Sequence, residues 1–157
     1  MQKKAMEKDR KSYQTGIVKK STTINASKKE VWCEISKIAG LAAWVVGVKK
    51  TTYTSKKKRG VGAIREITFE NGNTIEEHII QWNPMESFTY IATEGLPLRA
   101  YVATISITQK AKNKTQITWK SYINSKKMTK KQFLGFTSDM ELFYRTSFNN
   151  LKSALEK

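Results

Sequence analysis

The stretch that decides the fold runs from Arg65 to His78 and reads REITFENGNTIEEH. Strand-like alternation lies on both sides of a turn signal at Asn71-Gly72. Two hairpin registers are compatible with this pattern. A two-residue turn sets Arg65 opposite His78, whereas a three-residue loop with Gly72 in the left-handed conformation sets Arg65 opposite Glu77.

The hydrophobic pattern favours the three-residue loop, because only this register gathers the apolar residues of both strands on one face. That face holds Ala63, Ile67, Phe69, Ile75 and Ile79. The face toward water holds Glu66, Thr68, Glu76 and His78. The register carries Arg65 and Glu77 inward together, and a buried charge needs a partner. We therefore predict an ion pair with either a structural role or a role as polar anchor for a ligand's carboxylate, carbonyl or hydroxyl group.

Length and composition indicate a globular protein, with 157 residues, 39% of them hydrophobic and 27% charged. We expect residues 1–13 to form a flexible basic tail and residues 14–157 to form a single domain. No apolar run approaches the roughly 18–20 residues that span a bilayer, and the N-terminus lacks the apolar core of a signal peptide. The sequence therefore predicts a cytoplasmic protein without a transmembrane segment. With one Cys and one His, it predicts no metal and no cofactor.

The formal net charge of +16 has two interpretations. Clustered basic residues would indicate a module that binds RNA or an anionic surface. Most of the basic residues here are Lys, however, and they are scattered along the whole chain, which is typical of a solvated surface. We predict no specific nucleic-acid partner, and the RNA or anionic-surface module stays as an alternative.

The rest of the chain predicts an α+β fold. Residues 15–25 read as a strand, and the capping box of Ser27 and Glu30 begins a helix that we expect Gly40 to end. Residues 41–48, LAAWVVGV, predict a second short helix that turns at Gly47. Six strand-like runs follow, at residues 49–55, 62–69, 73–82, 87–93, 99–109 and 115–124. Without strand–helix–strand repetition, we expect an antiparallel sheet with its helices on one face.

Residues 129–156 predict one long amphipathic helix. Its expected apolar face holds Phe133, Phe136, Met140, Phe143, Ser147, Leu151 and Ala154. Its expected polar face holds Asp139, Thr146, Asn150 and Ser153. A curved sheet wrapped around this helix leaves space that suits an apolar ligand.

Alternation in the last two strands indicates which side chains face that space. The inward sets are Tyr101, Ala103, Ile105 and Ile107 in one strand, and Ile117, Trp119, Ser121 and Ile123 in the other. The same pattern is typical of a plain core, since a cavity wall and a core differ only in whether space remains.

Several segments, taken in order, resemble the SRPBCC superfamily. They are INASKKEVWCEIS, LAAWVVGV, GVGAIRE, NGNTIEEHI, SFTY, LPLRAYVATISI, TQITWKS and FNNLKSALE. The chain is similar to the polyketide cyclase/dehydrase-like group, with its START-like or birch-pollen-allergen-like helix-grip fold, from Gly16 to Leu155. One departure is that Val45-Val46-Gly47 follows Trp44, where the family often has a proline.

The resemblance implies non-covalent binding of a small hydrophobic molecule (a lipid, polyketide or aromatic compound) between the sheet and the C-terminal helix. We expect a monomer or weak homodimer. The predicted ligand-binding residues, with Tyr90 added by the resemblance, are Trp44, Arg65, Ile67, Phe69, Ile75, Glu77, Ile79, Tyr90, Tyr101, Ala103, Ile105, Trp119, Met140, Phe143 and Ser147.

The alternative is a polyketide cyclase/aromatase-like enzyme that uses Arg65, Glu77 and the cavity tyrosines for proton transfer or oxyanion stabilisation. Other catalytic signals are weak. By strand parity His78 faces outward, and Cys33 has no histidine near it in sequence. We therefore predict a binding protein and assign no catalytic residue.

Overall fold

The structure, a computed structural model, describes residues 13–156. Apart from Tyr13, the expected tail at residues 1–13 lies outside the described residues, so its flexibility stays a prediction. The strands are β1 (Gln14–Ile24), β2 (Val48–Tyr53), β3 (Ile64–Phe69), β4 (Thr74–Asn83), β5 (Ser87–Glu94), β6 (Ala100–Ala111) and β7 (Lys114–Ser125). The helices are α2 (Lys28–Ile35), the 3-10 turn η1 (Leu41–Ala43) and α3 (Lys130–Leu155).

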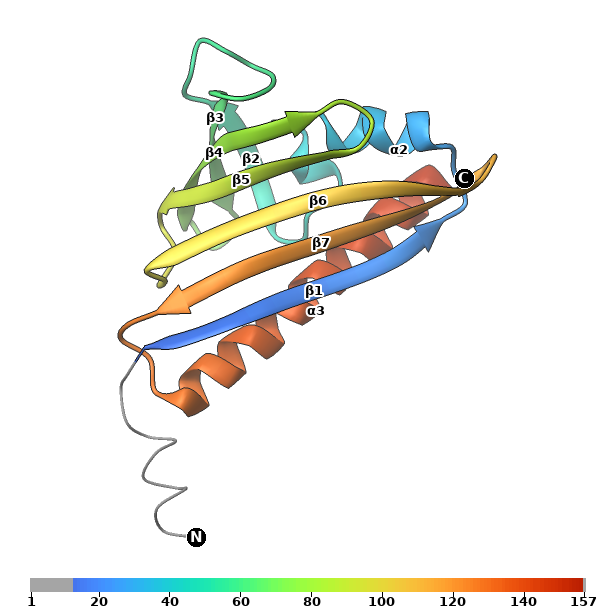
Figure 1. Cartoon of the computed structure of the whole chain (residues 1–157). Helices are drawn as coiled ribbons and strands as arrows, with labels where there is room; N and C mark the ends of the chain where they lie inside the picture. The colour runs from blue at the N-terminus through green and yellow to red at the C-terminus, as the bar shows by residue number, and fades with distance from the viewer. Residues whose placement is uncertain (1–12, 157) are drawn as a thin grey trace, which may run out of the picture.

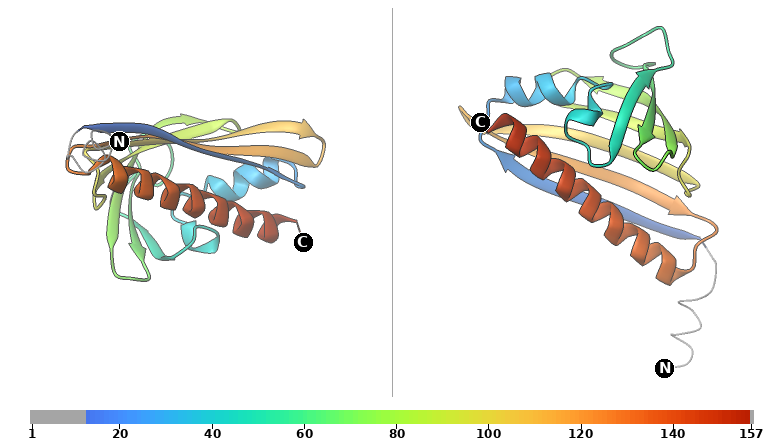
Figure 2. Two further views of the ribbon diagram at one scale, coloured as in Figure 1. Left: turned by 90° about the horizontal axis from the view of Figure 1, so that it is seen from below. Right: turned by 180° about the vertical axis from the view of Figure 1, so that it is seen from behind.

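The seven strands form one antiparallel sheet in the order β1-β7-β6-β5-β4-β3-β2 (Figure 1). α3 lies along one face of this sheet. Figure 2 shows that β2, β3 and β4 turn toward the side on which α3 lies, so the sheet curves around the helix. The predicted α+β helix-grip fold, with a curved antiparallel sheet wrapped around a long C-terminal helix, is confirmed.

The predicted hairpin register is also confirmed. Arg65 pairs with Glu77 across β3 and β4. The backbone N–H of Phe69 donates to the carbonyl of Asn73 at 2.9 Å. Gly72 has a φ of +87°, a conformation that glycine adopts without steric cost. With this three-residue loop, the apolar faces of β3 and β4 both point toward α3.

The first helix begins as predicted but ends early. Ser27 Oγ accepts from the N–H of Glu30 at 3.1 Å, and the Glu30 carboxylate accepts from the N–H of Ser27 at 3.0 Å. The prediction that the helix continues to Gly40 is wrong, because α2 ends at Ile35. The following turns bury Ile38 completely and direct its carbonyl oxygen toward an arginine of β3. The helix thus ends before Ile38, the residue that makes this tertiary hydrogen bond.

The buried face of α3 differs from the predicted one near its C-terminal end. Tyr144 and Phe148 are buried, although the predicted stripe omits both. Ala154 is exposed, and Leu155 packs against the core instead, because the helical repeat of 3.6 residues turns position 154 outward. Within residues 13–156, no helix combines the length and the apolar character needed to cross a bilayer.

Candidate functional site

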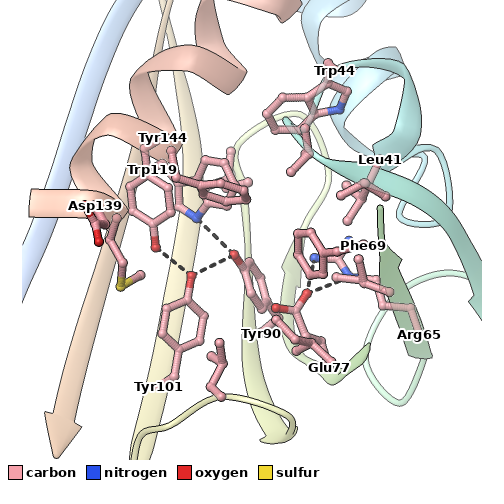
Figure 3. Close-up of a pocket in the computed structure, with 18 of the residues that line it drawn as sticks. Leu41, Trp44, Arg65, Phe69, Glu77, Tyr90, Tyr101, Trp119, Asp139 and Tyr144 are labelled. Carbon is pink, nitrogen blue, oxygen red and sulfur yellow. Dashed lines mark hydrogen bonds and ion pairs between the residues drawn. The ribbon is translucent and has the colours of Figure 1, made fainter. Parts of the chain in front are cut away.

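A cavity of about 330 Å³ lies between the sheet, the η1 segment and α3 (Figure 3). Most of its wall is aliphatic or aromatic. The predicted residues that line it are Trp44, Arg65, Ile67, Phe69, Ile75, Glu77, Tyr90, Tyr101, Ile105, Trp119, Met140 and Phe143. The structure thus brings side chains from η1 and its flank, six strands and α3 around one space.

Three predicted residues do not line the cavity. Ile79 and Ala103 have the inward parity but are 1% and 0% exposed, so neighbouring side chains cover them. The short Ala103 side chain does not reach the space that the larger Tyr101 reaches. Ser147 is also fully buried, and its Oγ accepts a hydrogen bond from the N–H of Val46 at 3.0 Å. The Ser147 contact ties α3 to the segment after η1, which is a structural role.

Several wall residues were not predicted. They are Leu41, Val45, Val48, Leu96, Phe136, Asp139 and Tyr144. The uninterrupted apolar character of residues 41–48 was a signal for the first three. Asp139 was expected on the polar face of α3, but it lines the wall while remaining exposed, because it lies three residues after Phe136 and four before Phe143 and therefore flanks the apolar face. No sequence pattern distinguished Tyr144 from its neighbour Phe143 as a residue of the cavity wall.

Arg65 and Glu77 form a buried ion pair in the wall. Arg65 is 2% exposed and Glu77 5%. The Nε and Nη2 atoms of Arg65 lie 2.9 Å and 2.8 Å from Oε1 of Glu77. The Nη1 atom donates to the carbonyl of Ile38 at 2.9 Å, and the guanidinium lies 4.9 Å from the ring centre of Tyr90. The cation is therefore held on three sides by the protein.

Glu77 keeps one oxygen without a protein partner. Both contacts from Arg65 reach Oε1, and Oε2 has no hydrogen-bond partner among the described residues. Burial raises the pKa of Glu77 above its ordinary value of 4.5, and this effect outweighs the opposing attraction of Arg65. The carboxyl group can therefore accept a hydrogen bond from a ligand at Oε2.

Four aromatic side chains, which Figure 3 shows, form a hydrogen-bonded chain with Ser121 beside the ion pair. Trp119 Nε1 donates to the Tyr90 hydroxyl at 3.0 Å, and the Tyr90 and Tyr101 hydroxyls are 3.2 Å apart. The Tyr101 and Tyr144 hydroxyls are 2.6 Å apart, and Tyr144 donates to Ser121 Oγ at 2.9 Å. Since each phenol has one hydrogen, the chain runs in one direction from Trp119 to Ser121.

This direction decides what the tyrosines offer a ligand. Their donor hydrogens are all used within the chain, whereas each phenol oxygen keeps some acceptor capacity. Burial raises the pKa of Tyr90 and Tyr101 well above the ordinary value of 10, and it also raises the pKa of Tyr144. All three are therefore neutral hydrogen-bond acceptors at physiological pH.

Trp44 supplies the complementary group. The side chain is 2% exposed, lines the cavity, and has an Nε1 without a hydrogen-bond partner among the described residues. A buried N–H without a partner costs free energy that a ligand oxygen would recover. Across residues 13–156, no three His, Cys, Asp or Glu side chains gather in a way that could hold a metal ion.

Sequence comparison identifies the family. The family described as polyketide cyclase/dehydrase and lipid transport matches residues 15–156. The chain belongs to this family. The predicted membership of the SRPBCC superfamily is thereby confirmed. No curated protein sequence matches the chain.

Solved structures share the fold at low sequence identity. An uncharacterised protein from Bacillus thuringiensis matches with a TM-score of 0.77 at 19% identity, covering 90% of this chain and all of that one. The protein XoxI from Bacillus cereus matches with a TM-score of 0.75 at 19% identity, covering 92% and 95%. Norcoclaurine synthase from Thalictrum flavum, in complex with dopamine and hydroxybenzaldehyde, matches with a TM-score of 0.68 at 17% identity, covering 91% and 87%.

Proposed function

We propose that this protein binds a small hydrophobic or amphipathic molecule non-covalently in the cavity beneath α3. The observation that carries this proposal is an apolar, aromatic cavity of about 330 Å³ whose lining residues include two with an unpartnered polar atom among the described residues, Glu77 and Trp44. Pockets that hold small molecules typically measure about 300–1,000 Å³ and have this kind of lining. The volume suits a compact ligand.

The polar atoms of the wall favour particular ligand chemistry. Glu77 Oε2 and the phenol oxygens accept hydrogen bonds, which matches a hydroxyl group on the ligand. Trp44 Nε1 has an unused hydrogen that would match a carbonyl or ether oxygen brought within its reach. The rings of Trp44, Trp119 and Phe143 suit an aromatic or polycyclic body. The complex of norcoclaurine synthase with two small aromatic molecules supports room for such ligands in this fold.

A cyclase/aromatase-like activity is the second candidate, and the raised pKa of Glu77 favours it. The unpaired Oε2 would be the atom that exchanges a proton with a substrate. The tyrosines contribute less to such a reaction, since their hydrogens are engaged and their pKa values are raised. Ligand binding without catalysis therefore explains more of the residues in the cavity wall than a catalytic role does.

Titration with N-phenyl-1-naphthylamine, a neutral apolar dye, tests the binding proposal. We expect a dissociation constant of about 1–10 µM, enhanced dye emission, and quenching of tryptophan fluorescence because Trp44 and Trp119 line the cavity. The variant Ile75→Trp should weaken binding, because the larger side chain takes up part of the space. The matched control is Ile80→Trp, at a side chain of the same strand that is 45% exposed.

The control variant should bind the dye as wild type does. Two results would refute the proposal: no binding of the dye by the folded wild-type protein, or equal binding by the folded Ile75→Trp variant. Circular dichroism of each variant establishes that it is folded.

A further inference from the structure

A second recess, which we call the vestibule, adjoins the cavity. It has a volume of about 870 Å³ and is lined by residues 96–99, residues 125–128 and side chains of the first turns of α3. In Figure 1 the β5–β6 and β7–α3 connections that supply these residues lie at the same end of the sheet. Leu96, Phe136 and Asp139 line both spaces. A ligand could therefore extend from one space into the other.

The vestibule is cationic. Arg99, Lys126 and Lys127 line it, against a single carboxylate from Asp139. Within residues 13–156, none of these three cations has a carboxylate partner. The N-terminus of α3 adds positive partial charge, and its first turn carries no acidic residue.

Contacts outside the recess hold two of the cations in place. The guanidinium of Arg99 lies 5.0 Å from the ring centre of Tyr13, and the ammonium group of Lys126 lies 5.9 Å from the same centre. The backbone N–H of Arg99 also donates to the carbonyl of Asn124 at 2.8 Å. Three basic residues thus line one recess, whereas the other lysines are dispersed along the chain.

Ser125 places an unpartnered hydroxyl group beside the vestibule, among the residues that the structure describes. It lines the vestibule, is only 1% exposed, and its Oγ has no hydrogen-bond partner among the described residues. Buried hydroxyl groups in folded proteins are nearly always hydrogen-bonded. The structure therefore leaves this hydroxyl hydrogen without an acceptor beside the vestibule.

We propose that the vestibule binds the anionic head of an amphipathic ligand whose apolar body occupies the cavity. The head is a carboxylate or a phosphate, since both present acceptor oxygens with negative charge. This inference rests on the proposed binding function and narrows its ligand class. Asp139, at the junction of the two spaces, opposes the anion and moderates its affinity.

Matched probes test the inference: decanoate, decyl phosphate, decan-1-ol and inorganic phosphate. Each is titrated by calorimetry or by displacement of the neutral dye, at 50 mM salt. We expect decanoate and decyl phosphate to bind about 5- to 10-fold more tightly than decan-1-ol, since each exposed charge contact contributes modestly. Most of this advantage should disappear at 500 mM salt because the cations are exposed. Inorganic phosphate, without an apolar body, should bind in the millimolar range or more weakly.

The variant with Arg99→Gln, Lys126→Gln and Lys127→Gln should lose the advantage of the anionic probes and keep the affinity for decan-1-ol within about twofold. The control removes the same charge elsewhere, with Lys110→Gln, Lys112→Gln and Lys114→Gln around the β6–β7 turn, at the opposite end of the sheet (Figure 1). It should retain the advantage. Asp139→Asn should tighten decanoate about two- to threefold relative to decan-1-ol.

The outcomes separate the two proposals. Equal binding of decanoate and decan-1-ol, or an advantage that survives the triple vestibule variant, would overturn the vestibule inference and leave the cavity intact. If inorganic phosphate bound as tightly as decyl phosphate, the apolar body would add nothing to affinity, and the proposal of an amphipathic ligand would be overturned. No binding of decan-1-ol or of the neutral dye would instead refute the proposed function itself.

Discussion

The hydroxyl oxygens of Tyr101 and Tyr144 lie 2.6 Å apart, and this contact joins β6 of the sheet to the middle of α3. Both side chains are buried, and the Tyr144 ring stacks on Trp119 with ring centres 4.0 Å apart. The contact therefore links the two layers that enclose the cavity, and it sets their spacing beside the ligand space.

Tyr144→Phe should destabilise the fold by about 1–3 kcal/mol, because Tyr101 and Ser121 each lose a buried hydrogen-bond partner. Urea unfolding followed by circular dichroism measures the change. The control is Tyr122→Phe, at a side chain that is 43% exposed, which should cost less than about 0.5 kcal/mol. Equal stabilities of the two variants would show that the hydrogen bonds among the tyrosine hydroxyls contribute nothing to the free energy of unfolding.

Arg65→Met should destabilise the protein by about 3–5 kcal/mol, because it leaves the Glu77 carboxylate buried without its cation. Adding Glu77→Leu should restore much of that stability, since the double variant buries no charge. Chemical denaturation of both variants gives the comparison. A double variant no more stable than Arg65→Met would indicate that the guanidinium bond to Ile38, and not the ion pair, is the main contribution.

The same double variant tests the polar anchor. If Glu77 Oε2 accepts a hydrogen bond from a ligand, 2-naphthol should bind the double variant about 5- to 10-fold more weakly than it binds wild type. Naphthalene, which has no hydrogen-bond donor, should bind both proteins alike. Unchanged 2-naphthol affinity would assign the pair a purely structural role.

The raised pKa of Glu77 predicts a pH dependence of stability. Between its unfolded value near 4.5 and its higher folded value, the folded protein binds more protons than the unfolded chain. Wild-type stability, relative to Glu77→Gln, should therefore be greatest below about pH 4.5 and decrease as pH rises through the folded pKa. Denaturation of both proteins from pH 4 to 7 measures this difference. An increase with pH would mean that Arg65 dominates and lowers the pKa.

Dispersed lysines predict weak binding to nucleic acid. Single-stranded RNA and duplex DNA should bind at 50 mM salt without sequence preference and dissociate by about 150 mM, because such binding depends on counterion release. Fluorescence anisotropy across a salt series measures it. Tight binding at high salt, or discrimination among sequences, would favour the alternative of a nucleic-acid module.

Local sequence patterns were sufficient for the hairpin and the helix starts. A strand repeats every two residues, so a shift of one residue would have turned the apolar set of one strand toward water. The pairing of Arg65 with Glu77 follows from that constraint alone. The capping box of Ser27 and Glu30 likewise involves residues only three apart. Such features depend on neighbours in sequence, and the chain encodes them directly.

The tertiary structure decided the features that depend on distant residues. The tyrosine chain draws its groups from β5, β6, β7 and α3, and no local periodicity records that their hydroxyls meet. α2 ends at Ile35, and the carbonyl of Ile38 then meets Arg65 from a different element. A cavity is the space that packed side chains leave between layers, so alternation predicted an inward face but could not predict whether that face encloses a core or a ligand site.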